Sequence, residues 1–126
     1  MKTKIETTKA PLPGASPHSQ AIAASGFIFT QGCICLTPEG KLLEGTLEDQ
    51  IHQIMKNLQA ILEEAGVSFL HVVKTTIYVT DMSLYGTVNT IYASYFSAPY
   101  PARETVCVKG LPLDAKVEIS MIAAKD

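Results

Sequence analysis

Arg103 is the residue whose type and place most clearly suggest chemistry. It is the only arginine in the chain, and it follows Pro101 and Ala102 at the head of an apolar run. Proline restricts the local backbone, and a planar guanidinium can bind a carboxylate through two parallel hydrogen bonds. A surface arginine is the commoner case. If no acidic side chain of the protein pairs with Arg103, a ligand carboxylate is the expected partner.

Glu118 is the second candidate. It lies in the segment AKVEISMIAA, where apolar residues alternate with Lys116, Glu118 and Ser120. Such alternation is typical of a strand and puts these three side chains on one face. A solvent-facing acid is the simplest interpretation, and a carboxylate that holds a water or moves a proton is the catalytic one. A third interpretation is an ion pair between Glu118 and Arg103, which would leave no arginine for a ligand.

Weaker candidates are polar residues near the N-terminus and on a predicted helix. His18, in SPHSQA, is a candidate only if its loop folds over a cleft, because histidine in a Pro/Ser loop is usually just polar. Ser19, Thr30 and Gln31 are placed to line such a pocket, and Asn89 is expected to make a structural hydrogen bond. The sequence contains no Ser-His-Asp arrangement, glycine-rich phosphate loop or paired-carboxylate motif.

The three cysteines, Cys33, Cys35 and Cys107, are expected to be reduced thiols, because no secretory signal is visible. On a strand, Cys33 and Cys35 would point to the same face. A metal site would also need Cys107 and a histidine, and no histidine pair has ligand spacing. We therefore expect no metal.

The bulk composition limits the class of protein. The 126 residues are 47% hydrophobic and 17% charged, which indicates one globular domain over residues 1–126. The net charge is −2 and the lysines do not cluster, so a nucleic-acid partner is disfavoured. No apolar leader or membrane-length segment is visible, so we expect a soluble, cytoplasmic protein.

Hydrophobic spacing predicts the element order β, β, β, α, β, α, β, β. Two strand candidates within QAIAASGFIFTQGCICL are separated by the turn dipeptide Ser25-Gly26, and the second of them covers 27–36. The last two strands fall within residues 99–123. The other predicted elements are a helix over 46–65 with Thr46 as N-cap and Gly66 as its stop, a strand over 71–80, and a helix over about 83–96.

This order indicates an α+β fold, a mixed sheet with two helices packed on one face. Two helices cover only one side of such a sheet, and another copy of the chain is the simplest cover for the other side. The almost wholly apolar segment 27–36 supports an interface there. We therefore predict a closed homo-oligomer with any cleft between subunits.

Seven segments in order resemble the Rid family, the reactive-intermediate deaminases: SPHSQAI, GFIFTQGCICL, GTLEDQIHQIMKNLQAILEEAG, VVKTTIYVTDM, VNTIYASYF, PARETV and LPLDAKVEISMIA. The resemblance covers nearly the whole chain. It implies a chorismate-mutase-like fold assembled as a homotrimer, with an active site at each subunit interface and no cofactor. It also implies hydrolysis of 2-imino acids or their enamine tautomers, such as 2-iminobutanoate and 2-iminopropanoate, to 2-keto acids and ammonia.

The resemblance assigns roles to residues of this chain. Arg103 matches the arginine of the family's Pro-Ala-Arg motif, which binds the substrate carboxylate. Glu118 matches the acid of the last strand, which positions the attacking water. Thr30 and Gln31 match the edge of the pocket, and His18 stands where the family usually has a tyrosine.

Two departures from the family pattern affect the expected activity. An imidazole at His18 shortens the reach of the usual aromatic ring, so the preferred substrate size is open. Glu104 and Thr105 replace the usual Ser-Cys after the arginine. We expect Glu104 to face away from Arg103, and Thr105 to offer its backbone carbonyl to a water. Cys107 does not occupy the family's cysteine position.

Two other functions stay open from the sequence. A non-catalytic trimer that binds small carboxylates, or acts as a chaperone, would keep the pocket without the chemistry. RNA cleavage has been attributed to relatives, but the negative net charge disfavours it here.

Overall fold

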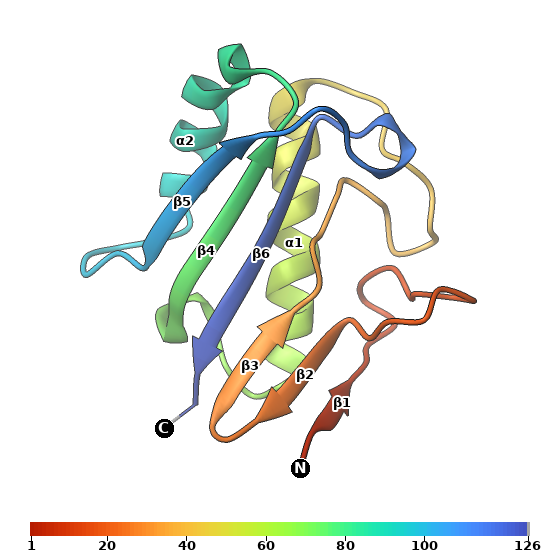
Figure 1. The fold of residues 1–126 in the computed structure, drawn as a ribbon, viewed down its shortest axis with the longest axis vertical. Helices are drawn as coiled ribbons and strands as arrows, with labels where there is room; N and C mark the ends of the chain where they lie inside the picture. The colour runs from red at the N-terminus through yellow and green to blue at the C-terminus, as the bar shows by residue number, and fades with distance from the viewer. Residues whose placement is uncertain (126) are drawn as a thin grey trace.

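The computed structural model describes residues 1–125, which form one six-stranded sheet with both helices on the same face (Figure 1). The strand order across the sheet is β1-β2-β3-β6-β4-β5, and only β4 and β5 run parallel. The predicted α+β class and the predicted element order are therefore confirmed. The elements are β1 (Thr3–Ile5), β2 (Ala21–Ala24), β3 (Phe27–Thr30), α1 (Leu47–Glu64), β4 (Val72–Val79), α2 (Tyr85–Ala93), β5 (Ala102–Cys107) and β6 (Val117–Ala124).

Local capping interactions set both ends of helix α1. The Thr46 hydroxyl accepts a hydrogen bond from the Asp49 amide at 3.1 Å, and the Asp49 carboxylate accepts one from the Thr46 amide at 3.4 Å. This capping box satisfies two amides of the first turn. Gly66 has φ +82°, a left-handed conformation that favours glycine and stops the helix. No helix within residues 1–125 is long and apolar enough to cross a membrane.

The core lies between α1 and the helix-covered face of the sheet. The residues of α1 buried there are Ile51, Ile54, Met55, Asn57, Leu58, Ile61 and Leu62. Strand β6 supplies Val117, Ile119, Met121 and Ala123 to the same layer, and its other residues lie on the opposite face. The alternation predicted for Lys116, Glu118 and Ser120 is therefore confirmed.

The predicted strand over 27–36 is wrong beyond Thr30. The Thr30 hydroxyl accepts from the Met121 amide at 2.9 Å and donates to the Gln31 carbonyl at 2.8 Å, so a side chain replaces the regular ladder there. The chain rejoins β6 at Cys33, which exchanges two backbone hydrogen bonds with Ile119. A side-chain hydrogen bond of this kind leaves no signal in hydrophobic spacing.

The helix predicted over 83–96 is shorter in the structure. Met82–Leu84 form a 3₁₀ turn. Asp81 caps its N-terminus, because the Asp81 carboxylate accepts a hydrogen bond from the Ser83 amide at 2.8 Å. Helix α2 then runs over Tyr85–Ala93, and the aromatic residues that follow pack on the core from irregular backbone.

The face of the sheet away from the helices is open in the single chain (Figure 1). On β3, Ile28 is 2% exposed, whereas Phe27 and Phe29 are 42% and 43% exposed. The single chain leaves both rings exposed, so the expectation that this segment lies at an interface stays a prediction. Val106 of β5 is exposed as well.

Candidate functional site

Arg103 lies on the edge strand β5, opposite Thr75 of β4 in the parallel register. Because Thr75 is on the helix-covered face, the Arg103 side chain points under α2. There Nη1 donates to Asn89 Oδ1 at 2.7 Å, and Nη2 donates to the Tyr85 hydroxyl at 2.9 Å. The guanidinium carbon also lies 5.1 Å from the ring centroid of Tyr92 and 5.7 Å from that of Tyr85.

All of these partners are uncharged. The ion pairs within residues 1–125 are Lys4–Glu6 and Lys74–Glu104, and neither includes Arg103. Glu104 faces away from Arg103, as expected, and its Oε1 lies 3.1 Å from Lys74 Nζ. Arg103 also lines a cavity of about 270 Å³ together with Asn89, Tyr92, Ala93, Tyr100 and Pro101. An arginine fixed by neutral acceptors and aromatic faces keeps its charge available for an anion.

Glu118 lies on the central strand β6, opposite Tyr78 of β4, on the open face of the sheet. Its half-buried carboxyl group loses hydration, and this desolvation raises its pKa above the usual value of 4.5. Gly32 passes directly over it: a Cβ at this position would lie 2.3 Å from Glu118 Oε2. Only glycine permits this approach of the backbone to the carboxylate without displacing one of them.

A short hydrogen-bonded chain lies beside Glu118. Ser16 Oγ is 2.7 Å from His18 Nδ1, and His18 Nε2 is 2.8 Å from Gln31 Oε1. An amide oxygen can only accept, so Nε2 of His18 donates in this contact, and the two contacts together fix the ring orientation. His18, Gln31 and Glu118 line one cavity of about 330 Å³, so the loop of His18 does fold over a cleft. Ser16, Gly32 and Cys33 also line it, and the remaining lining residues are apolar: Pro11, Leu12, Pro13, Ile34, Leu36, Pro112 and Leu113.

Cys33 lines the same cavity, but its thiol is not a nucleophile. Burial raises its pKa to about 12, so the thiol stays protonated near neutral pH. Cys35 is also buried and Cys107 is exposed, and all three cysteines are free. Within residues 1–125 there is no group of three or more Cys, His, Asp or Glu side chains arranged to hold a metal ion.

The two candidate residues do not meet within one chain. Arg103 faces the helix-covered side of the sheet and Glu118 faces the open side, with β4 between their strands. The interpretation of an Arg103–Glu118 ion pair is therefore wrong within one chain. Thr105 lies opposite Ile77, on the same side as Arg103. The Thr30 hydroxyl is used in holding β3 to β6.

Sequence reasoning missed Tyr85 as a partner of Arg103, whereas the structural hydrogen bond expected of Asn89 is confirmed by its contact with the guanidinium. Tyr85, Asn89 and Tyr92 follow one another at spacings of four and three residues, which places them on one face of α2. This mixed polar and aromatic face could have indicated partners for a charged side chain, because a helix face that only packs on the core is usually aliphatic. For the close approach of Gly32 to Glu118, no signal exists in the sequence.

Comparisons with known proteins place the chain in a family. A family profile described as Endoribonuclease L-PSP matches residues 7–125. A RutC family protein of Aquifex aeolicus is 50% identical over 97% of this chain and 98% of its own length. The 2-iminobutanoate/2-iminopropanoate deaminase of Mus musculus is 43% identical over 96% of this chain and 90% of its own.

Solved structures agree in fold. A Rid family protein from Yersinia pestis is 43% identical with a TM-score of 0.94, over 98% of this chain and 99% of that one. E. coli TdcF, solved with bound serine, is 34% identical with a TM-score of 0.91, over 98% and 99% of the two chains. The resemblance seen in the sequence is therefore confirmed, and the chain belongs to the endoribonuclease L-PSP family, which includes the Rid and RutC proteins.

Proposed function

We propose that this protein hydrolyses small 2-imino acids, such as 2-iminobutanoate and 2-iminopropanoate, to 2-keto acids and ammonia. The observation that carries the proposal is the environment of Arg103. Its guanidinium is fixed by Asn89 and Tyr85, has no acidic partner within residues 1–125, and lines a cavity. A substrate carboxylate would supply the missing charge, and one such contact contributes roughly 1.5–3 kcal/mol. A relative named as a deaminase of these imines and another solved with serine support a small carboxylate ligand.

We propose that the working site forms between two copies of the chain in a homotrimer. Arg103 and Glu118 face opposite sides of one sheet, so a single copy offers each substrate only one of them. The open face carries exposed Phe27 and Phe29, an apolar surface that a second copy would cover. In this arrangement Arg103 of one subunit and Glu118 of its neighbour line the same cleft.

The proposed reaction is an addition followed by an elimination. Arg103 orients the substrate by its carboxylate, and Glu118 accepts a proton from a water as the water oxygen attacks the C=N carbon. The C=N electron pair moves to nitrogen, which takes the proton from Glu118, and a neutral tetrahedral carbinolamine forms. Glu118 then accepts the proton of the new hydroxyl group as its oxygen forms the C=O bond. The same proton passes to nitrogen as the C–N bond breaks, so ammonia leaves and Glu118 is again ionised.

The remaining family-matched residues take supporting roles in the proposal. His18 and Gln31 line the cavity of Glu118 and contact the substrate body, and Thr105 offers its backbone carbonyl to a water. Thr30 holds the backbone of Gln31 in place through its hydroxyl. No cofactor or metal has a step in this mechanism.

The first experiment measures turnover directly. A dehydratase generates 2-iminopropanoate from serine, and the appearance of pyruvate is followed with and without the purified protein. We expect faster hydrolysis than the spontaneous rate, abolished by Arg103→Ala. Calorimetric binding of 2-ketobutyrate without any acceleration would instead favour a non-catalytic carboxylate-binding protein.

The second experiment tests whether the site is shared between subunits. Arg103→Ala and Glu118→Gln chains are unfolded together, refolded as a mixture and assayed. If each site takes Arg103 from one copy and Glu118 from another, about a quarter of the sites in a random mixture are intact. Activity should therefore reappear in the mixture although each variant alone is inactive. A mixture as inactive as its components would contradict the shared site.

A further inference from the structure

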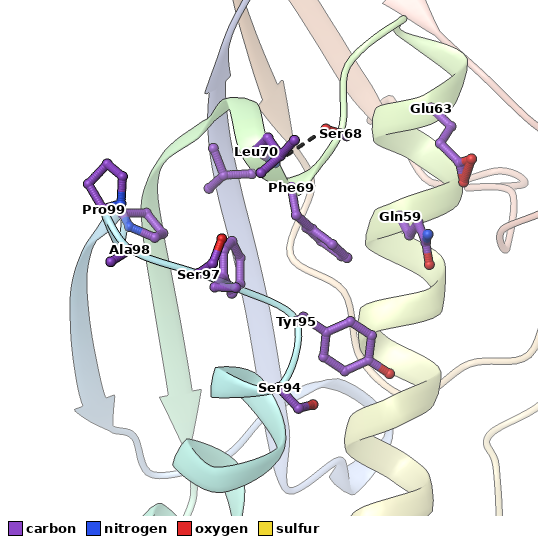
Figure 2. Close-up of a pocket in the computed structure, with 13 residues that line it drawn as sticks. Gln59, Glu63, Ser68, Phe69, Leu70, Ser94, Tyr95, Ser97, Ala98 and Pro99 are labelled. Carbon is purple, nitrogen blue, oxygen red and sulfur yellow. Dashed lines mark hydrogen bonds between the residues drawn. The ribbon is translucent and has the colours of Figure 1, made fainter.

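A larger cavity, separate from the cavities that Arg103 and Glu118 line, lies on the helix side of the sheet (Figure 2). Its volume is about 560 Å³, within the range of roughly 300–1,000 Å³ that is usual for small-molecule sites. It is bounded by the C-terminal half of α1, the 3₁₀ turn Phe69–His71 and the segment 94–101 that joins α2 to β5. Neither Arg103 nor Glu118 lines it, and Pro101 is the one residue it shares with the cavity of Arg103. We call it the aromatic cavity.

Aromatic rings form the base of this cavity. The ring centroid of Phe69 lies 5.7 Å from that of Tyr95, nearly edge-on, and 5.3 Å from that of Phe96. Phe96 in turn stacks on Tyr92 at 4.6 Å. The Tyr95 hydroxyl is hydrogen-bonded to His52 Nδ1, which fixes the ring from α1. The aromatic wall is therefore built from the protein's own packing and is in place before any ligand arrives.

The charged lining of the aromatic cavity is negative. Glu63 is its only charged lining residue, and it lies one helix turn from Gln59 on the same side of α1 (Figure 2). Glu63 takes part in neither of the ion pairs within residues 1–125. Ser97, from the opposite wall, adds an exposed hydroxyl. Aromatic faces are themselves electronegative, so the rings and the carboxylate favour the same kind of ligand.

We propose that the aromatic cavity binds a small organic ammonium ion with an apolar or aromatic body. The body would pack on Phe69 and Tyr95, and the ammonium group would donate to the Glu63 carboxylate, with Gln59 and Ser97 as further acceptors. A carboxylate ligand would meet Glu63 with no compensating cation. The aromatic cavity thus selects the opposite charge from Arg103, and its ligand is a different molecule from the imino acid.

The test uses three probes of similar shape and different charge: 2-phenylethylamine, 2-phenylethanol and 3-phenylpropanoate. Isothermal titration calorimetry on the full chain should show that the amine binds more tightly than the alcohol and that the anion does not bind. Glu63→Gln should weaken the amine about tenfold or more and leave the alcohol unchanged. Glu64→Gln is the matched control, because it removes the same charge from the adjacent exposed residue, which does not line the cavity.

A blocking variant provides an independent reading. Ser97→Trp places a large ring in the cavity and should abolish amine binding, with folding checked by circular dichroism. Equal weakening in Glu63→Gln and Glu64→Gln, equal affinity for amine and alcohol, or no binding of any probe would each overturn the proposal. Imine turnover should be unchanged in Glu63→Gln, so the result does not depend on whether the protein is a deaminase.

Discussion

The surroundings of Arg103 and those of Glu118, the two half-sites of the proposed active site, have opposite effects on the charges that they hold. Arg103 lies under α2 with two neutral hydrogen-bond acceptors and two aromatic faces, all of which interact favourably with the guanidinium. Glu118 sits on the open face in a largely apolar cavity, where loss of hydration raises its pKa and disfavours its anionic form. One charge is stabilised by its surroundings and the other is destabilised.

This difference matches two tasks in one reaction. A group that only binds a carboxylate should stay charged and fixed, because orientation is its contribution. A group that accepts a proton from water works better when its pKa lies closer to the working pH, which desolvation brings about. The comparison therefore predicts that the Arg103 side controls substrate binding and that the Glu118 side controls the chemical step.

The largest effect should come from Glu118→Gln. The amide keeps the shape of the side chain but cannot accept a proton, so kcat should fall by about 10²–10⁴-fold while KM changes little. Steady-state assay of 2-iminopropanoate hydrolysis gives both constants. A variant that mainly raised KM would instead give Glu118 a role in substrate binding and contradict this assignment.

The pH profile of the unmodified protein should show the titration of Glu118. Because Glu118 must be deprotonated to accept a proton, activity should fall as the pH drops through its raised pKa. The acidic limb should therefore lie above the usual value of 4.5 for a glutamate. A limb at or below that value would show that another group titrates.

Arg103→Lys should affect binding more than chemistry. Lysine keeps the charge but loses the planar fork that reaches Asn89, Tyr85 and a carboxylate together. We expect KM to rise by about 10–100-fold with a much smaller change in kcat. Tyr85→Phe, which removes one of the two hydrogen bonds, should give a weaker change in the same direction, and an effect confined to kcat would contradict this assignment.

Gly32→Ala tests the position of Glu118 rather than its chemistry. The new methyl group would lie 2.3 Å from Glu118 Oε2, so the carboxylate must move. We expect kcat to fall by about 3–10-fold, since a misplaced base still accepts protons. Gly14→Ala is not a useful control, because Gly14 has φ +63°, but Gly86→Ala is, because nothing lies near its added Cβ.

The sequence predicted the periodic parts of the molecule and missed the local exceptions. The spacing of Ile51, Leu58 and Leu62 identified α1, and Thr46 and Gly66 marked its ends, because capping and amphipathicity depend on neighbouring residues. The end of β3 was misjudged because the Thr30 hydroxyl bonds to a strand 91 residues away.

The site was predictable by residue type but not by placement. Arg103 stood out because it is the only arginine, and Glu118 because it interrupts an apolar strand. That they face opposite sides of the sheet depends on the parallel pairing of β5 and the antiparallel pairing of β6 with β4. Strand pairing of this kind depends on tertiary contacts. The sequence pattern therefore could not decide whether Arg103 and Glu118 form an ion pair within one chain.

The smallest predicted effect concerns stability. The folded-state pKa of Glu118 is raised, so its ionised form costs free energy of folding at pH values above that pKa. Glu118→Gln should therefore raise the free energy of unfolding near pH 7, by no more than about 1 kcal/mol. The gain should disappear as the pH falls below the pKa of an unfolded glutamate, because Glu118 is then neutral in both states.

Urea unfolding at pH 7 and pH 4 measures this difference, with Glu104→Gln as the control. Glu104 is an exposed acid on β5 that pairs with Lys74, so its replacement should give no gain at either pH. A gain near pH 7 in the variant that loses most activity would show that the protein gives up stability to keep an acid in an apolar cavity. A loss of stability in Glu118→Gln would mean that the ionised carboxylate is stabilised where it lies, and the contrast between the two half-sites would fail.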